Sequence, residues 1–116
     1  SVANPDKTAQ LLCDLFNWEV RWSGPSMDDG YTVHVGSKQS YLALYRGKTM
    51  QGSAQRGHTS LNNLNHIGVI VDNLKTYEEK ALELGLTPES FKDYGVNKSF
   101  YVSDEFGLEI EILSYA

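Results

Sequence analysis

His66 and Glu111 are the two side chains in this sequence whose types and positions could do chemistry together. His66 begins a run of mostly apolar residues, and Glu111 lies between two isoleucines near the end of the chain. An imidazole and a carboxylate on one face of a sheet can bind a divalent metal ion or move protons on a substrate. The alternative is an ordinary role, in which His66 is only hydrogen-bonded and Glu111 is only solvated.

Three further side chains bear on this pair. Tyr101 lies ten residues before Glu111, across a predicted hairpin, where its phenol could lie beside a bound ligand. His34 sits between two valines of a predicted strand, and we expect it to face solvent or a partner. His58 lies in a long polar segment and is expected at the surface. Both histidines therefore rank below His66 as candidate ligands.

Aromatic residues supply a second candidate feature, a wall for a small molecule. Stacking and cation–π contacts with planar or cationic ligands contribute roughly 0.5–2 kcal/mol each. The alternative is that these rings pack in the core or at a dimer interface, where aromatic residues are also common. The rings expected to frame the ligand come from the predicted strands and are Trp18, Trp22, Tyr31, Tyr41, Tyr45 and Tyr101.

Composition bounds the functional class. The chain has 116 residues, 41% of them hydrophobic, and fits one compact domain. A net charge of −5 disfavours non-specific nucleic-acid binding. No run approaches the roughly 20 apolar residues that span a bilayer, and the first residues lack the features of a secretory signal. The single Cys13 excludes an intramolecular disulfide and favours a reducing cytoplasm.

Each half of the chain predicts a helix and several strands. Asn4 can cap the first helix, Pro5 suits its first position and Asn17 can end it. Gly85 can end the second helix, which is expected to bury Tyr77, Ala81 and Leu84. Strands are expected at 18–23, 31–35, 40–45, 64–71, 91–94, 97–103 and 107–114, with a turn-rich run at 23–30 and a hairpin turn at 104–107.

The two halves repeat each other. Lys7 and Thr8 recur as Lys75 and Thr76 at an offset of 68, and other apolar positions follow at 68 or 69. The sequence therefore predicts two β-α-β-β-β modules in one domain, 1–116, with the first strand of the first module short or truncated. Module 1 spans about 1–46, a linker spans 47–63 and module 2 spans about 64–116. A lid or an arm across a partner is the alternative for the linker.

Strand alternation sorts the side chains into two faces. Aliphatic residues at alternate positions should lie under the helices. The other, concave face should then carry His66, Glu111, Ala43, Tyr41 and Tyr45.

The segments Asn65–Asp72 and Ser99–Ile112 resemble the vicinal oxygen chelate superfamily. This family includes glyoxalase I, bleomycin-resistance proteins, fosfomycin-resistance thiol transferases and extradiol dioxygenases. The resemblance implies an α+β fold in which two β-α-β-β-β modules form curled mixed sheets around a cavity. It also implies a homodimer.

The resemblance implies a metal-ligand set as well. Metal-using members place ligands on the first and last strands of the modules, positions that His66 and Glu111 match. The offset of 68 maps Glu111 onto Ala43, which cannot coordinate, and maps the counterpart of His66 before Ser1. Because such metals need three or four ligands, we expect the native chain to extend upstream of Ser1 with a third ligand there.

The leading functional prediction is a small-molecule binding protein of the glyoxalase/bleomycin-resistance type, without a cofactor, for a cationic or aromatic drug-like ligand. Trp18, Trp22, Tyr41, Ala43, Tyr45 and Tyr101 would contact that ligand. The alternative is a metal-dependent lyase, isomerase or dioxygenase, with His66 and Glu111 on the metal and Glu111 and Tyr101 in catalysis. Ala43 disfavours glyoxalase I activity, and no set of basic residues suits a phosphonate. A third possibility is an interaction module whose cavity is vestigial.

Overall fold

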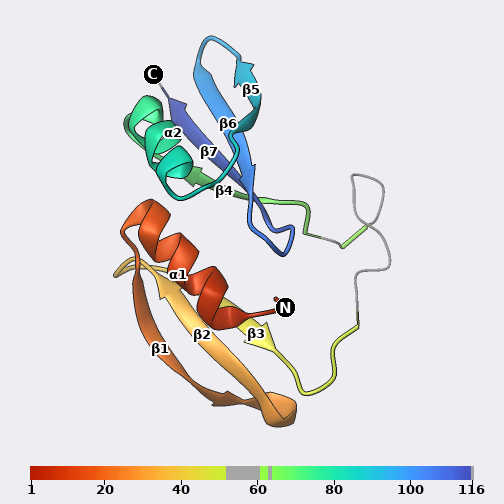
Figure 1. Cartoon of the computed structure of the whole chain (residues 1–116). Coiled ribbons are helices and arrows are strands. Elements are labelled where there is room, and N and C mark those ends of the chain that lie inside the picture. Colours follow the sequence, from red (N-terminus) through yellow and green to blue (C-terminus); the bar gives the residue numbers. More distant parts are fainter. Residues whose placement is uncertain (52–60, 63, 116) are drawn as a thin grey trace. The chain divides into compact units, whose positions relative to one another are not determined.

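The computed structural model describes residues 1–51, 61–62 and 64–115. The chain divides between residues 52 and 53 into two units, each described here by itself (Figure 1). The division falls inside the segment 47–63 that we expected to be a linker. Residues 52–60 and 63 of that segment, including His58, lie outside the described residues.

Unit 1 is a helix followed by a three-stranded antiparallel sheet of order β1-β2-β3 (Figure 1). The expected turn-rich run at 23–30 is wrong over residues 23–26, because β1 continues to Ser26, which pairs with Gly30, and the turn is confined to Met27–Asp29. Gly24 and Pro25 are tolerated there since β1 is an edge strand. The elements are α1 (Pro5–Phe16), β1 (Glu19–Ser26), a short 3-10 helix (Met27–Asp29), β2 (Gly30–Gly36) and β3 (Tyr41–Arg46).

Local capping explains the bounds of α1. The side chain of Asn4 accepts a hydrogen bond from the backbone N–H of Lys7 at 3.1 Å, as predicted for an N-cap. Asn17 ends the helix in the left-handed conformation, at φ 57°, and its N–H donates to the Cys13 carbonyl. The face that α1 buries includes Ala9, Leu12, Leu15 and Phe16.

The residues before α1 are fastened to the sheet. The N–H of Val2 donates to the Tyr45 carbonyl at 2.8 Å, and Nη1 of Arg46 donates to the Ala3 carbonyl at 2.7 Å. The Tyr31 hydroxyl donates to Oδ1 of Asp6 at 2.7 Å. The backbone hydrogen bond from Val2 to Tyr45 on β3 is what the structure has in place of a first strand in module 1, in agreement with the short strand that we predicted.

Unit 2 repeats the helix and the three following strands of unit 1, and it has in addition a complete first strand, β4. Its mixed sheet has the order β4-β7-β6-β5, with β4 parallel to β7 and the other pairs antiparallel. The predicted strand 97–103 is confirmed, whereas the strand predicted at 64–71 is shorter and that at 91–94 begins earlier. The elements are β4 (Ile67–Ile70), α2 (Leu74–Glu83), β5 (Glu89–Asp93), β6 (Asn97–Ser103) and β7 (Glu109–Tyr115).

Hydrogen bonds and register confirm the internal repeat. The N–H of Val71 donates to the Leu113 carbonyl at 2.8 Å, which repeats the contact of Val2 in unit 1. Ala43 pairs with His34, and its counterpart Glu111 pairs with Tyr101. One edge strand of each sheet also carries a bulge, between Val20 and Trp22 in β1 and between Glu89 and Lys92 in β5. The α+β fold of two related modules is therefore confirmed.

The core of each unit lies between its helix and one face of its sheet. Alternate aliphatic residues of the strands are buried there, as predicted. We call the other side of each sheet its open face. The two helices cover their sheets unequally: α2 buries only Ala81, and Leu84, which we expected to be buried, is 37% exposed. The buried strand residues are Val33, Val35, Leu44, Phe100, Val102, Ile110 and Ile112.

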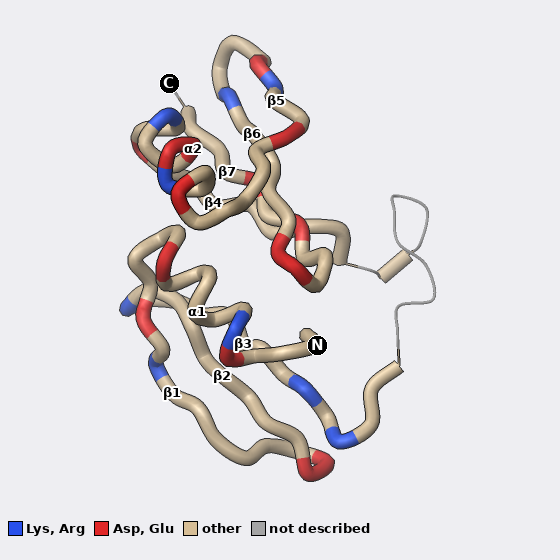
Figure 2. The backbone as a smooth tube through the Cα atoms, viewed as in Figure 1, with Lys and Arg blue, Asp and Glu red and all other residues tan. Residues whose placement is uncertain are grey.

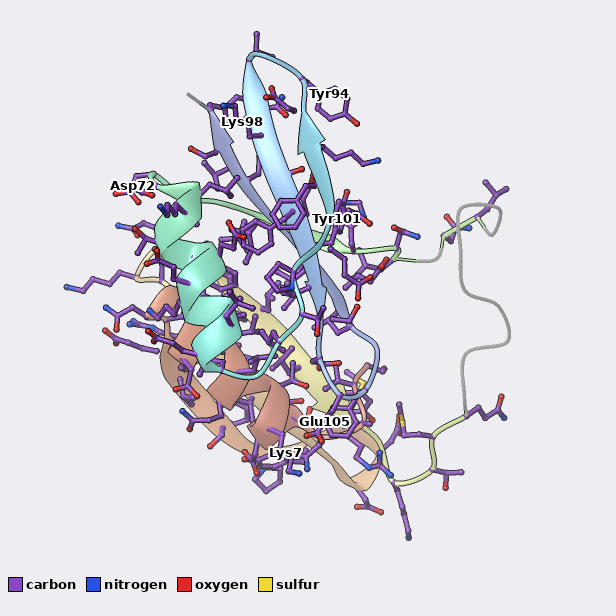
Figure 3. The ribbon with its side chains drawn as sticks, turned by 45° about the horizontal axis from the view of Figure 1, so that its top comes forward. Lys7, Asp72, Tyr94, Lys98, Tyr101 and Glu105 are labelled. Carbon is purple, nitrogen blue, oxygen red and sulfur yellow. The ribbon has the colours of Figure 1, made fainter. Side chains whose placement is uncertain are left out.

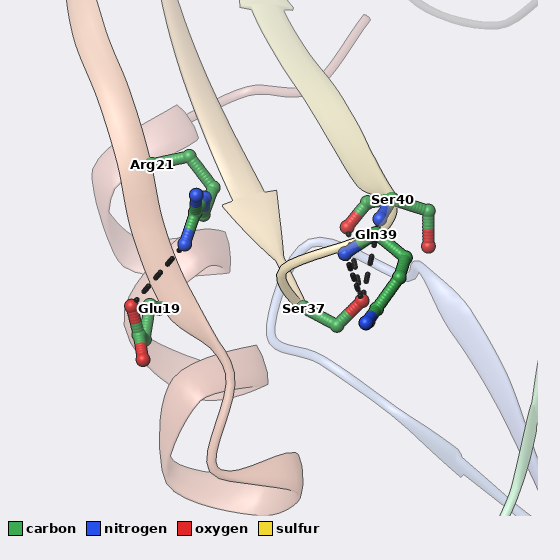
Figure 4. A network of polar contacts seen from close by, with 5 residues as sticks. All are labelled: Glu19, Arg21, Ser37, Gln39 and Ser40. Atoms are coloured by element: carbon green, nitrogen blue, oxygen red, sulfur yellow. Dashed lines mark hydrogen bonds and ion pairs between the residues drawn. The ribbon is translucent and has the colours of Figure 1, made fainter.

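A compact turn joins β2 to β3 and sets their register (Figure 4). The Ser37 N–H donates to the Ser40 carbonyl at 2.9 Å. The Ser37 hydroxyl oxygen accepts from the N–H groups of Gln39 and Ser40 at 3.2 and 3.3 Å. On the neighbouring edge strand, Arg21 and Glu19 form an exposed ion pair at 3.4 Å.

In the described part of the chain, neither helix has the length and hydropathy to cross a membrane.

The equivalent N-caps Asn4 and Asn73 give a matched test of the two helices. Changing either residue to alanine leaves a helix N–H without its side-chain acceptor and should lower the free energy of unfolding by about 0.5–2 kcal/mol. Urea unfolding followed by circular dichroism measures the change. The exposed Lys75→Ala is the control, expected within about 0.5 kcal/mol of the parent. An equal loss in the control and the cap variants would contradict the capping role.

Candidate functional site

The structure brings three predicted residues together on the open face of unit 2. Nε2 of His66 lies 3.5 Å from Oε1 of Glu111. The rings of His66 and Tyr101 meet edge to face, with centroids 5.2 Å apart and planes at 75°. We call His66, Tyr101 and Glu111 the polar cluster. Figure 3 shows Tyr101 on β6, the strand beside β7.

Strand pairing explains how the polar cluster forms. β7 is the central strand of the three that supply it, and Glu111 has Tyr101 directly opposite on β6 and Gly68 beside it on β4. A Cβ added at Gly68 would lie 3.6 Å from Oε1 of Glu111, so the carboxylate extends over this glycine. His66, two residues earlier on the same face, is thereby brought within reach of the carboxylate.

Asn65 sets the tautomer of His66. Its Oδ1 lies 2.8 Å from Nδ1 of the ring, and because a carbonyl oxygen only accepts, Nδ1 carries the proton. Nε2 is then directed at Glu111, and in the neutral ring it presents a lone pair. The side chains of His66 and Glu111 are 31% and 20% exposed, so solvent and small molecules can reach them.

Tyr101 keeps its proton beside this pair. Burial is the largest cause that raises the pKa of its phenol, followed by the charge of Glu111 and a hydrogen bond to Glu111. Weaker contributions come from Glu109 and Tyr94. The hydroxyl is therefore a hydrogen-bond donor at neutral pH.

The open face of unit 1 carries aromatic residues instead. Trp22, His34 and Tyr41 lie side by side across β1, β2 and β3, and we call them the aromatic row. The centroids of His34 and Tyr41 are 4.1 Å apart with planes at 17°, and those of Trp22 and His34 are 5.2 Å apart. Ala43 pairs with His34 on the same face. Sequence reasoning missed His34 as a member of this row. The internal repeat held the signal, because His34 lies 67 residues before Tyr101 and pairs with Ala43 as Tyr101 pairs with Glu111.

The other predicted ligand contacts are engaged elsewhere. Trp18 packs on Phe16 of α1, with ring centroids 5.1 Å apart. The Tyr45 hydroxyl donates to the Met27 carbonyl at 3.0 Å and fastens the turn before β2. The Tyr31 hydroxyl is held by Asp6. Of the predicted ring set, Trp22, Tyr41 and Tyr45 share the open face of unit 1, although the hydroxyl of Tyr45 is engaged by Met27, and Tyr101 lies on the open face of unit 2.

The polar cluster supplies part of a metal site. Two ligand atoms that bind one metal at about 2.0–2.2 Å are themselves separated by about 3.0–3.6 Å, which the distance of 3.5 Å matches. A ring whose second nitrogen donates to an amide oxygen is also typical of metal-binding histidines. Among the described residues, no group of three or more His, Cys, Asp or Glu side chains is placed to hold a metal ion. His66 and Glu111 thus fit as two ligands of a larger set.

Comparisons with known proteins give matches only among solved structures, since no protein-family model and no curated protein matches. A glyoxylase/bleomycin resistance protein/dioxygenase domain from Frankia sp. EAN1pec superposes with a TM-score of 0.76 at 13% identity, covering 99% of this chain and 91% of that one. A glyoxalase family protein from Enterococcus faecalis has a TM-score of 0.74 at 17% identity, covering 95% and 88%. This chain has the vicinal oxygen chelate fold.

A third vicinal oxygen chelate structure carries a metal. The fosfomycin resistance protein FosX from Listeria monocytogenes, complexed with Mn(II) and sulfate, has a TM-score of 0.71 at 18% identity and covers 99% of this chain and 86% of that one. At these identities the likeness establishes the fold, and the resemblance drawn from Asn65–Asp72 and Ser99–Ile112 is confirmed at that level. The function of this chain has to be argued from its own side chains.

Removing the charge of Glu111 should lower the pKa of Tyr101 toward its ordinary value. Glu111→Gln keeps the shape of the side chain but deletes the charge that disfavours the phenolate. Titration of the Tyr101 Cζ chemical shift measures the change, and Glu79→Gln on α2 is the control. An unchanged pKa in Glu111→Gln would show that the carboxylate does not act on the phenol.

The same shift predicts the pH dependence of stability. The folded chain holds the Tyr101 proton more tightly than the unfolded chain does. This contribution is therefore fully present below about pH 10 and is lost as the pH rises through the raised pKa.

Proposed function

We propose that this protein binds a small, positively charged molecule on the open face of unit 2, at the polar cluster. One observation carries the proposal: Nε2 of His66 and Oε1 of Glu111 face each other at 3.5 Å while Nδ1 of His66 donates a hydrogen bond to Oδ1 of Asn65. In the neutral ring, both facing atoms are electron-pair donors. A cation or an N–H donor placed against them would interact favourably with both.

Charge distribution supports a cationic ligand. Residues 53–116 contain ten acidic and five basic side chains, whereas residues 1–52 contain five of each. The entire net charge of −5 thus belongs to the second half of the chain (Figure 2). Glu109 lies two residues before Glu111 on β7, and alternation places it on the same face. The carboxylates of Glu109 and Glu111, which share this face, would attract cations to the cluster.

Tyr101 would contribute in two ways. Its ring lies beside His66 and offers a π surface to an ammonium group, a contact worth about 0.5–2 kcal/mol. Its hydroxyl donates to Glu111, and the lone pairs of the phenol oxygen are left to accept a hydrogen bond from an N–H of the ligand. These are the properties of a binding protein for a drug-like amine, as the glyoxalase/bleomycin-resistance resemblance implies.

A metal-dependent enzyme of the lyase, isomerase or dioxygenase kind is the second candidate. The separation of His66 and Glu111 and the hydrogen bond from His66 to Asn65 favour it, and FosX is a structural neighbour crystallised with Mn(II). A bound divalent metal would polarise a substrate oxygen. His66 and Glu111 would hold it, the remaining positions would be filled by substrate and water, and Tyr101 would hydrogen-bond the substrate.

Two further expectations belong with the proposal. The thiol of Cys13 has a pKa raised by burial and by the charges of Asp14 and Glu19, so the thiol is protonated at neutral pH. A reducing compartment such as the cytoplasm is proposed from the sequence alone, because a single cysteine forms no intramolecular disulfide. A homodimer is proposed from the family resemblance alone.

Benzylamine, which is protonated at pH 7, tests the binding proposal. Isothermal titration at low ionic strength should detect binding to the parent protein. Glu111→Gln should weaken it by about tenfold or more, because a hydrogen bond to a charged group is lost. Glu79→Gln should leave the affinity unchanged, and benzyl alcohol should bind weakly to every variant. Equal affinity for the amine in the Glu111 and Glu79 variants would refute the proposal.

Mn(II) titration tests the second candidate. The electron paramagnetic resonance signal of free Mn(II) should fall as one equivalent binds, and His66→Ala should restore it. Asn65→Ala should weaken Mn(II) binding by about tenfold or more, because the ring would lose the partner that orients it. His34→Ala, which removes a histidine from unit 1, is the control. A signal that the parent protein leaves unchanged excludes this candidate.

A further inference from the structure

We infer that the ligand of the polar cluster is a dication, whose second ammonium group lies beyond Tyr101 against Glu89 on β5. The inference rests on the proposed function, because it adds a second contact to the same site on unit 2. Glu111 pairs with Tyr101 across β7 and β6, and Glu89 pairs with Tyr101 across β5 and β6. Two carboxylates therefore flank one tyrosine.

Strand register places Glu89 on the open face of unit 2. Residues directly opposite each other in an antiparallel pair lie on the same face of a sheet, so Glu89 shares the face of Tyr101. The bulge after Glu89 turns Phe91 to the other side, where its ring packs on the buried Phe100 with centroids 5.7 Å apart. Because the strand order is β7-β6-β5, Glu111, Tyr101 and Glu89 form a row across the sheet (Figure 1).

The width of this row sets the distance between the two charges of the ligand. Neighbouring strands lie 4.7–4.9 Å apart, so the backbones at Glu111 and Glu89 are separated by about 10 Å. Two ammonium groups at opposite ends of a benzene ring span most of this width, and hydrogen bonds to the carboxylates span the remainder. The Tyr101 ring between them offers an aromatic contact to the middle of the ligand.

The charges on the open face match a dication. Among the four strands of unit 2, alternation and register assign four charged side chains to this face: Glu109 and Glu111 on β7, and Glu89 and Lys92 on β5. Three carboxylates and one ammonium group leave two negative charges, since His66 is neutral. A ligand with one ammonium group neutralises half of this charge, and a dication neutralises all of it.

Glu89 is available to a ligand. Its side chain is exposed, and it makes no ion pair with any described residue. Lys98, which lies on the neighbouring strand β6, pairs instead with Asp93 at 3.9 Å. Alternation places Lys98 on the side of the sheet opposite Tyr101. The carboxylate of Glu89 thus has no cation of its own chain.

A buried hydroxyl beside the row also lacks a partner. Ser99 lies two residues before Tyr101 on β6 and therefore on the same face. It is 1% exposed, and its Oγ has no hydrogen-bond partner in the described part of the chain. Leaving such a group unpaired costs free energy. An ammonium group has three N–H donors, so it can bond to a carboxylate and still supply the donor that this hydroxyl lacks.

Two isomers of bis(aminomethyl)benzene test the inference. The para isomer carries its ammonium groups at opposite ends of the ring, whereas the ortho isomer carries them on adjacent carbons and cannot reach both carboxylates. In isothermal titration at low ionic strength, the para isomer should bind about two- to fivefold more tightly, the gain of one exposed ion pair. Both isomers have the same charge and two equivalent ends, so general attraction and statistics cancel from this ratio.

Variants then assign the second contact. Glu89→Gln should abolish the preference for the para isomer and leave the affinity for benzylamine unchanged. Glu79→Gln on α2 removes the same charge away from the sheet and should change neither result. Circular dichroism of each variant confirms that a loss of binding is not a loss of fold.

The inference and the proposed function fail in different ways. Equal binding of the two isomers, or a para preference that Glu89→Gln retains, would overturn the inference while benzylamine still binds through Glu111. If benzylamine binding does not depend on Glu111, the proposed function is refuted, and the inference that rests on it is refuted as well.

Discussion

Burial of alternate aliphatic residues along each strand is the constraint on which both open faces depend. Ile110 and Ile112 are fully buried, so the side chain between them, Glu111, has to lie on the other side of β7. Phe100 and Val102 do the same for Tyr101 on β6. A slip of one residue would place a carboxylate in the core and two isoleucines in water. The geometry of the polar cluster therefore follows from hydrophobic packing on the opposite face.

Features encoded within a few residues were predictable from the sequence. The N-cap Asn4, the left-handed Asn17 and the hairpin before β7 all appear where local rules placed them, and the hairpin uses Gly107 at a φ of 90°. Sorting the strands by alternation was also enough to bring His66 and Glu111 to one face. These predictions needed neither the exact register nor the contacts between elements.

Features that depend on contacts between strands were not predictable. The bulge in β1 shifts Trp22 into register with His34, and the local composition does not predict this bulge. Asn65 lies within the predicted strand 64–71, where alternation assigns it to the face opposite His66, yet its side chain reaches Nδ1 of His66 and fixes the tautomer of that ring. The weak cover that α2 provides is likewise a matter of packing, because its apolar spacing is ordinary and Leu84 still lies 37% exposed.

The bulges in the outer strands have a consequence for the behaviour of the chain in concentrated solution. β1 and β5 end their respective sheets, and each is irregular at the equivalent point, with Ser90 of β5 at a φ of 52°. A foreign strand that approached either edge would meet an interrupted ladder of hydrogen bonds. Pro25 in β1 and Lys92 in β5 add a missing donor and a charge at the same edges. Fibrillar growth by strand addition is thereby opposed at β1 and β5, one of the two edges of each sheet.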